Sequence, residues 1–169
     1  MSQGIVGAVL LPVCPETPSF DAYKRVTVGS ATLAPVGIRD VFMIKLDPSG
    51  SPVWAKNIGG STNDAGRGIF LDASGISYTT GEFSGSMAVG TTSLTAVGGR
   101  DVFMIKLDPS GNPVWAQNFG GSSTDTGYGI AVDASGSSYT TGLFRGSMTV
   151  GDTTLTAQGE NMFVIKLIP

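Results

Sequence analysis

Four aspartates that open short turns are the residues whose type and position could do metal chemistry. Each turn reads D-P-S-G or D-A-S-G, and the aspartates are Asp47, Asp72, Asp108 and Asp133. A calcium loop needs several oxygen ligands at spaced positions along the chain. Since each turn here supplies one carboxylate, we interpret these residues as turn caps that accept backbone N–H groups two residues on. We expect neither a metal site nor a cofactor.

Two glycine-rich loops, Gly59–Asp64 and Gly120–Asp125, could be compared with phosphate cradles. Such cradles need their glycines at the start of a helix, followed in the P-loop by a lysine. No lysine and no helical pattern follows either loop. We therefore interpret both as connections between repeated units.

Candidate contacts with a ligand or partner come from aromatic residues and from positions that vary between repeats. Trp54 and Trp115 could stack on sugar rings, although packing within repeated strands explains them as well. Positions that differ on a repeated frame are places where recognition could be tuned. The candidate contacts of this second kind are Arg67 and Tyr128. Two further equivalent pairs differ in the same way: Glu82 and Leu143, and Ser84 and Arg145.

Catalysis finds little support in the composition. The chain has no histidine, so a serine or cysteine nucleophile would lack its usual base. A carboxylate pair for glycoside cleavage is possible in principle. However, the carboxylates are mostly turn aspartates at equivalent places, and no unique pair stands out. We expect no catalytic residues and no enzyme activity.

An internal repeat must position all of these residues. Val41–Gly98 and Val102–Gly159 match at 42 of 58 positions with a constant offset of 61. The block V-F-M-I-K-L-D-P-S-G is identical in both copies, and a similar block begins again at Met162–Leu167. A fixed period of this kind indicates a repeat architecture. Because a repeated unit does not easily hold a single catalytic constellation, the repeat favours a scaffold or a binding surface.

Each repeat reads as four short strands in two hairpins. Val, Ile, Phe, Tyr, Trp and Thr are concentrated between turns, and no apolar spacing of 3.6 residues occurs. In Val41–Leu46 both alternating faces are largely apolar, which predicts a sheet covered on both sides. A Gly- and Thr-rich excursion, Ser84–Arg100, follows the second hairpin and accounts for the long period. The predicted strands are Val41–Leu46, Val53–Asn57, Gly68–Leu71 and Ser77–Phe83, then Val102–Leu107, Val114–Asn118, Gly129–Val132 and Ser138–Phe144.

Four short antiparallel strands per repeat are the unit of a β-propeller. The motifs D-V-F-M-I-K-L-D-P-S-G-x-P-V-W-A, N-x-G-G-S-x-x-D-x-G-x-G-I and D-A-S-G-x-S-Y-T-T-G-x-F-x-G-S-M resemble the bacterial β-propeller repeat of the SBBP type. The resemblance implies an all-β, propeller-like fold in surface or extracellular settings, and it carries no catalytic residues. The motifs lie at Asp40–Ala55, Asn57–Ile69 and Asp72–Met87, and again at Asp101–Ala116, Asn118–Ile130 and Asp133–Met148.

The segment before the repeats divides the chain. Residues 1–25 are predicted to be an N-terminal arm or a degenerate first hairpin. Residues 26–169 are the repeat domain, with repeats near 41–101 and 102–161 and a partial third copy at 162–169. Subtracting 61 places Val28-Gly29 under Val89-Gly90, and Gly7–Leu10 under Gly68–Leu71. The proline-rich stretch Pro12–Ser19 is a poor strand.

Composition narrows the setting. The net charge of −3 and the isoelectric point near 4.7 argue against a nucleic-acid partner. No stretch is long enough to span a bilayer, and Ile5–Val13 is too short and lacks the basic flank of a signal peptide. With 41% hydrophobic and only 14% charged residues, we expect apolar surface to be buried between chains.

Two or three blades cannot close a propeller ring, which takes about four to eight. We expect an incomplete propeller that identical subunits complete, as a dimer or trimer. The predicted function is a non-catalytic structural or interaction protein in a larger surface or virion-like assembly, such as a capsid decoration or tail component. Its other partners would be assembly proteins or surface glycans. The alternative is a carbohydrate-binding lectin formed by blade oligomerisation.

Overall fold

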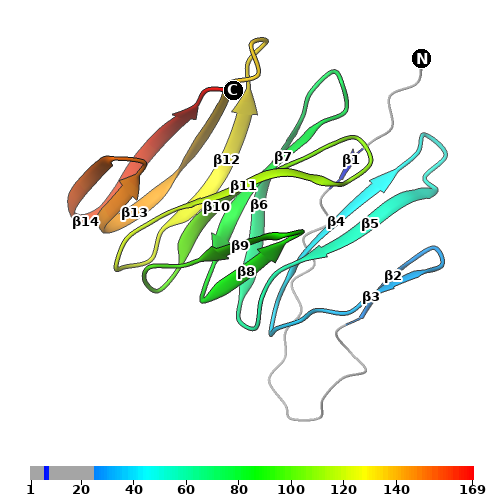
Figure 1. Cartoon of the computed structure of the whole chain (residues 1–169), viewed down its shortest axis with the longest axis horizontal. Coiled ribbons are helices and arrows are strands. Elements are labelled where there is room, and N and C mark those ends of the chain that lie inside the picture. The colour runs from blue at the N-terminus through cyan, green and yellow to red at the C-terminus, as the bar shows by residue number, and fades with distance from the viewer. Residues whose placement is uncertain (1–5, 8–24) are drawn as a thin grey trace.

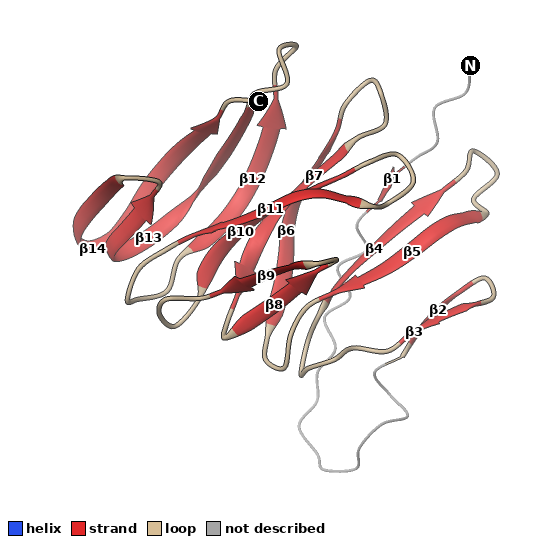
Figure 2. Cartoon of the chain, in the orientation of Figure 1, coloured by secondary structure: helices blue, strands red, loops and turns tan. Residues whose placement is uncertain are grey.

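The computed structural model describes residues 6–7 and 25–169, and in these residues the regular structure consists of β-strands alone (Figures 1 and 2). The predicted all-β class is therefore confirmed for this part of the chain. No helix among the described residues is long and apolar enough to cross a membrane. The strands are β1 (Val6–Gly7), β2 (Val26–Val28), β3 (Ala31–Leu33), β4 (Val41–Leu46), β5 (Pro52–Ile58), β6 (Asp64–Leu71), β7 (Ser77–Phe83), β8 (Ser86–Val89), β9 (Thr92–Thr95), β10 (Asp101–Leu107), β11 (Pro113–Phe119), β12 (Thr126–Val132), β13 (Ser138–Val150) and β14 (Thr153–Leu167).

Three main antiparallel sheets lie side by side (Figure 1). The middle sheet has four strands in the order β11-β10-β7-β6. It joins the second hairpin of one repeat to the first hairpin of the next, whereas the sequence predicted that the two hairpins of one repeat form the unit. The first sheet has the order β1-β4-β5 and the third the order β12-β13-β14. The four-stranded unit is thus found once among the described residues, and the three sheets do not close a ring.

The offset of 61 predicts the position of one N-terminal hairpin correctly and the pairing of Gly7 incorrectly. The hairpin of β2 and β3 has the same position relative to the repeat as the hairpin of β8 and β9, as the placement of Val28-Gly29 predicted. Gly7, expected in the place of Gly68 on the outer strand of a hairpin, pairs instead with Ile44 of β4. At the equivalent position of the middle sheet, Ile105 of β10 pairs with Thr79 of β7. The predicted register of Gly7 is therefore wrong, and Ala8–Leu10 and Pro12–Ser19 lie outside the described residues.

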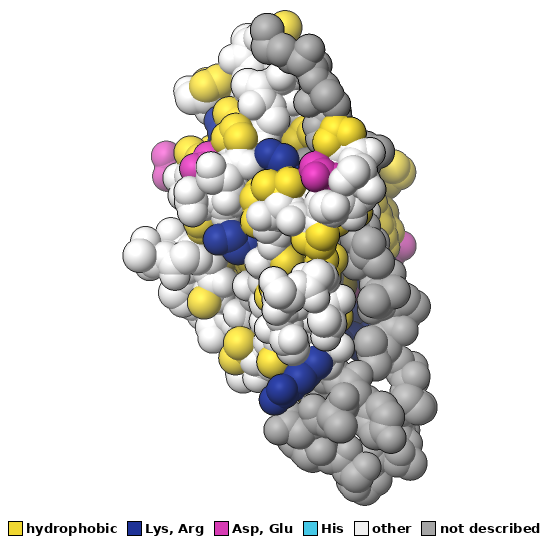
Figure 3. Space-filling model, turned by 90° about the vertical axis from the view of Figure 1, so that its right-hand side faces the viewer, with side chains coloured by type: hydrophobic (Ala, Val, Ile, Leu, Met, Phe, Trp, Pro, Cys, Tyr) yellow, Lys and Arg dark blue, Asp and Glu magenta, His cyan; other side chains and the backbone are white. Residues whose placement is uncertain are grey.

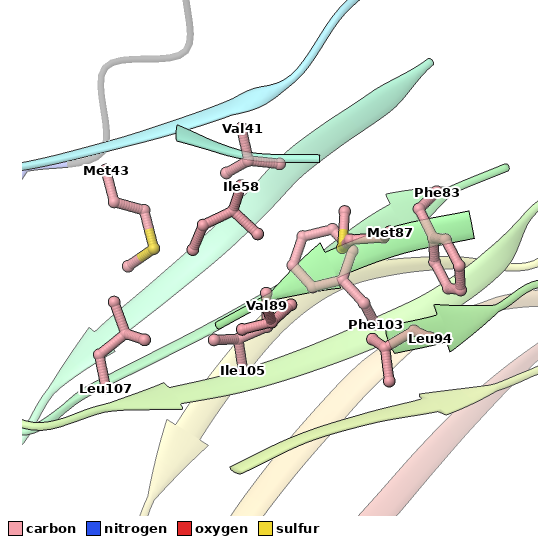
Figure 4. Packing of buried hydrophobic residues seen from close by; sticks show 10 residues of the cluster. All are labelled: Val41, Met43, Ile58, Phe83, Met87, Val89, Leu94, Phe103, Ile105 and Leu107. Carbon is pink, nitrogen blue, oxygen red and sulfur yellow. The ribbon is translucent and has the colours of Figure 1, made fainter. Parts of the chain in front are cut away.

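The first core joins the first sheet to the middle sheet (Figure 4). It contains Val41 and Met43 from β4 and, across the seam, the alternate residues Phe103, Ile105 and Leu107 from β10. These three β10 side chains are fully buried. Alternation along the strand sends every second side chain to this face, as the repeated V-F-M-I-K-L block predicted.

The second core uses the opposite face of the same strand. Val102 and Met104 of β10 pack with Phe163 and Ile165 of β14 across the seam to the third sheet. Phe119, Phe144 and Met148 complete this cluster. The middle sheet is therefore covered on both faces, as we expected of a sheet with two apolar sides.

The Gly- and Thr-rich excursion of the middle repeat fills the outer part of the first seam. Its hairpin, β8 and β9, contributes Met87, Val89 and Leu94 to the first core. On one side the Ala88 N–H donates to the Gly59 carbonyl at the end of β5, and on the other Gly90 packs against Pro113 of β11. The additional residues of the long repeat thus form a wedge between the outer strands of neighbouring sheets (Figure 1).

The wedge gives a matched stability test. Leu94 is buried in the first core, whereas Leu155, its equivalent one repeat later, is 36% exposed. Leu94→Ala should lower the free energy of unfolding by about 2–5 kcal/mol, since it removes buried methyl groups and leaves a cavity. Leu155→Ala should cost clearly less. Equal losses in urea unfolding would contradict the role assigned to the wedge.

Candidate functional site

Each turn aspartate accepts hydrogen bonds from backbone N–H groups of its own turn. The Asp47 carboxylate accepts the N–H groups of Ser49 (2.8 Å) and Ser51 (2.9 Å), and the other three turns repeat this pattern. Hydrogen bonds led by that from the Ser135 hydroxyl lower the pKa of Asp133 to about 2. The interpretation as turn caps is confirmed. In the described part of the chain, no group of three or more acidic, histidine or cysteine side chains is placed to hold a metal ion.

The glycine-rich loops are packed against carboxylates. A Cβ at Gly59 would lie 2.5 Å from the Asp40 Cγ, and one at Gly120 would collide with Asp101. The Gly60 N–H donates to Asp64 over 2.7 Å. Close packing within the fold therefore accounts for these glycines, in keeping with their interpretation as connections.

Three of these loop aspartates are buried and hold raised pKa values. Burial, with a smaller contribution from the nearby Asp40 carboxylate, raises the pKa of Asp64 to about 6. Burial likewise raises the pKa of Asp101 and of Asp125. Each accepts a hydrogen bond from the backbone N–H group four residues earlier in its own loop, and the donors are Gly60, Val97 and Gly121. These hydrogen bonds fix the loops at the ends of the strands, although burying a carboxylate removes part of its hydration.

The two tryptophans are engaged inside the fold. The Trp54 Nε1–H donates to the Pro109 carbonyl (3.2 Å), and Gly111 of the same turn lies against the indole ring. Trp54 therefore ties the first sheet to the D-P-S-G turn of the next repeat. Trp115 meets the Tyr78 ring edge to face, with 6.4 Å between ring centroids, and packs against the second core.

Arg67 and Tyr128 project from equivalent β-bulges. The pairing of β6 with β7 shifts register between Gly66 and Gly68, and that of β12 with β13 shifts between Gly127 and Gly129. In each case the residue between the glycines is left out of the ladder, and bulges of this kind re-aim a side chain. Tyr128 is 50% exposed, and the Arg67 side chain is 44% exposed.

The two bulged strands are neighbours. A Cβ at Gly68 would lie 2.9 Å from the Tyr128 carbonyl oxygen, so β6 and β12 approach closely at the edges of their sheets. The structure thus brings together the two varied positions, Arg67 and Tyr128. Trp54 and Trp115 are engaged in other contacts.

Glu82 lies between the two sheets at this place. Its Oε1 is 3.0 Å from Arg67 Nη2 and 2.9 Å from Arg100 Nη1, and its Oε2 accepts the Thr126 hydroxyl over 2.6 Å. Glu82 itself is buried. Burial opposes its ionisation, but the hydrogen bonds from Thr126 and Arg67 outweigh this and hold the Glu82 pKa below its usual value. We call Glu82, Arg67, Arg100 and Thr126 the Glu82 cluster.

Sequence reasoning noted that Glu82 and Arg67 vary between repeats, but it did not find the cluster. Arg100 and Thr126 come from the next loop and the next sheet, and no spacing along the chain marks them. The signal that could have found its charged members is the charge pattern, since each of the three charged positions of the cluster differs from its counterpart one repeat later.

Comparison with known proteins bears on the repeat itself. A model of the SBBP β-propeller repeat family matches residues 114–143, which span most of β11, all of β12 and the start of β13. Residues 114–143 are thus similar to the SBBP-type β-propeller repeat. The predicted resemblance is thereby confirmed, and the offset of 61 places the equivalent stretch of the preceding repeat at residues 53–82. No curated protein matches the chain.

The buried aspartates predict an unusual pH dependence. Asp64 has a raised pKa in the folded state, so the folded chain binds more protons than the unfolded chain between about pH 6 and the ordinary value of 3.8. The free energy of unfolding should therefore rise as the pH falls from 7 to about 5.5. The chain has no histidine to titrate in this window. Urea unfolding at the two pH values measures the effect.

Two variants serve as checks. Asp64→Asn should reduce the rise between pH 7 and 5.5, because it removes the titrating group. Asp72→Asn should leave the rise unchanged, since the Asp72 pKa is lowered and its proton binds below this window. A fall in stability over the same interval in the unaltered chain would show that the assigned shift has the wrong sign.

Proposed function

We propose that this chain is a non-catalytic interaction protein that associates head to tail with copies of itself through the outer faces of its first and third sheets. The family match supports a repeat-based interaction fold. The specific support for self-association is the likeness between the two seams inside the chain and the two faces at its ends.

The internal seams share one design. On one side lie the first and third residues of the V-F-M-I-K-L block, and on the other lie the second, fourth and sixth residues of the next copy of this block. In the first seam Val41 and Met43 pack against alternate residues of β10, which are Phe103, Ile105 and Leu107. In the second, Val102 and Met104 meet Phe163 and Ile165. The face that carries the first and third residues of the block therefore packs, in both seams, against the face that carries the second, fourth and sixth residues of the next block.

The third sheet presents one half of this contact to solvent. Met162 and Val164 of β14 stand where Val102 and Met104 stand in the middle sheet, and they are 80% and 70% exposed. Ile168 beyond the strand is 78% exposed. Neighbouring apolar residues of this size on one sheet face are typical of an interaction surface.

The first sheet carries the other half. Phe42, Ile44 and Leu46 of β4 correspond to Phe103, Ile105 and Leu107. Ile44 is buried, whereas Phe42 and Leu46 remain partly exposed. Figure 3 views the molecule from the side of the first sheet, where hydrophobic side chains stand among a few charged ones.

A contact between these two faces would be heterologous, because different surfaces of the two copies meet. Such contacts form a closed ring where the rotation between copies allows it. Two copies of three sheets would supply six blades, within the range of closed propellers. Self-association would complete the propeller that one copy leaves open.

The setting of the assembly stays a prediction from the sequence. That prediction is a larger surface or virion-like assembly, in which the chain would be a capsid decoration or a tail component. The lectin alternative was based on Trp54 and Trp115. The contacts of Trp54 with Pro109 and Gly111 favour a structural role for that residue. A glycan array with Trp54→Ala and Trp115→Ala would test the alternative directly.

Light scattering after size-exclusion chromatography tests the proposal. The chain has a mass of 17.3 kDa, and at micromolar concentration we expect about twice this mass, since two copies would supply six blades. Val164→Lys should shift the population toward monomer, because it places a charge in the apolar contact. Val97→Lys is the control, since Val97 is 73% exposed but lies in a loop away from this face.

Two outcomes would contradict self-association through this face. One is an unaltered chain that stays monomeric throughout the micromolar range. The other is equal loss of the oligomer in Val164→Lys and Val97→Lys, which would show a general effect of the added charge.

A further inference from the structure

Two guanidinium groups share one carboxylate oxygen in the Glu82 cluster. Arg67 from β6 and Arg100 from the loop before β10 both contact Glu82 Oε1, at 3.0 and 2.9 Å. Both arginine side chains are 44% exposed, whereas that of Glu82 is 6% exposed. The Glu82 carboxylate thus lies beneath the surface, and the two guanidinium groups that it binds lie at the surface.

The cluster has one net positive charge. The lowered Glu82 pKa means that its carboxylate is ionised at neutral pH, and arginine remains charged throughout this range. Arg67 bonds Glu82 through Nη2 and Arg100 through Nη1. Each guanidinium carries five N–H donors, so both can donate further bonds on their exposed sides. A single negative charge placed there would be matched by both arginines.

The neighbouring strand β12 carries an exposed aromatic residue. Thr126, which donates to Glu82, and Tyr128 lie two residues apart on β12. The Tyr128 backbone approaches Gly68, the residue after Arg67. Tyr128 is 50% exposed and projects from the bulge equivalent to that of Arg67. The strands that carry Arg67 and Tyr128 are therefore neighbours at the edges of two sheets.

We propose that this surface, formed by Arg67, Arg100 and Tyr128, binds a ligand that combines a carboxylate with an apolar ring face, which is the chemistry of a uronic acid. The two arginines bind the ligand carboxylate, and Tyr128 packs against the sugar ring. Arginine matches a planar carboxylate well, and aromatic rings pack against the C–H face of sugars. A monoanion balances the single net charge, whereas a phosphate dianion would leave a negative excess.

This site lies on strands β6 and β12, and Met162 and Val164 of the end face lie on β14. The inference therefore does not rest on self-association. A variant that loses the ligand should retain its mass in light scattering, and the two proposals can fail separately.

Titration calorimetry with trigalacturonate as the probe tests the inference. The acid should bind, and its methyl ester should bind at least about tenfold more weakly, because the neutral ester cannot accept charge-assisted hydrogen bonds from the arginines. Arg67→Met and Arg100→Met should each weaken binding of the acid by about tenfold or more. Tyr128→Ser should weaken binding of the acid as well.

Arg145→Met is the matched control. Arg145 is another exposed arginine paired with one glutamate, Glu160, in the third sheet. Its loss should leave the affinity for trigalacturonate unchanged. Urea midpoints of all variants at the titration temperature would show that each is folded when it is tested.

Three results would overturn the inference. The first is no binding of trigalacturonate at millimolar concentration by the unaltered chain. The second is equal affinity for the acid and the ester, or an equal loss in Arg145→Met. The third is tighter binding of inorganic phosphate than of trigalacturonate, which would assign the cluster to a different ligand class.

Discussion

Strand β10 is hydrogen-bonded along both edges, to β7 and β11, and covered by apolar side chains on both faces. Every residue from Asp101 to Ile105 is buried. The two cores meet on opposite sides of this one strand, so the first and third sheets are held in place through it. Removing water from both faces of a strand requires a run of apolar side chains without alternation of polarity, and the V-F-M-I-K-L block supplies it.

This packing sets where interaction surfaces lie. Strands β6 and β12 approach closely, while the outer strands β5 and β11 are separated by the hairpin of β8 and β9. The sheets therefore fan out from the β6 and β12 side, as blades do around an axis. The closely spaced edges carry the bulged residues Arg67 and Tyr128, and the outermost faces of the fan carry Val164 and its neighbours. Ligand recognition and self-association are thus assigned to different parts of one frame.

The repeat allowed the strands, the turn caps and the two-sided middle sheet to be predicted, because these depend on local spacing and on alternation. The register of Gly7 was wrong, since an apolar strand edge can accept a segment from any point in the chain, and spacing does not encode that choice. The Glu82 cluster was not predicted either, because variation between repeats marks its charged positions but not which of them meet. Thr126 and Arg100 reach Glu82 only because of how adjacent sheets pack, and a repeat pattern describes one sheet at a time.

Hydrogen exchange across a range of protein concentrations tests the central role of β10 most directly. The account predicts that the amides of Val102–Ile105 exchange slowest at every concentration, because they open only with global unfolding. Amides of Met162–Leu167 should exchange much faster in dilute solution and become protected as the concentration rises. Exchange in β10 as fast as in β5, or slow exchange of Met162–Leu167 at all concentrations, would contradict the account.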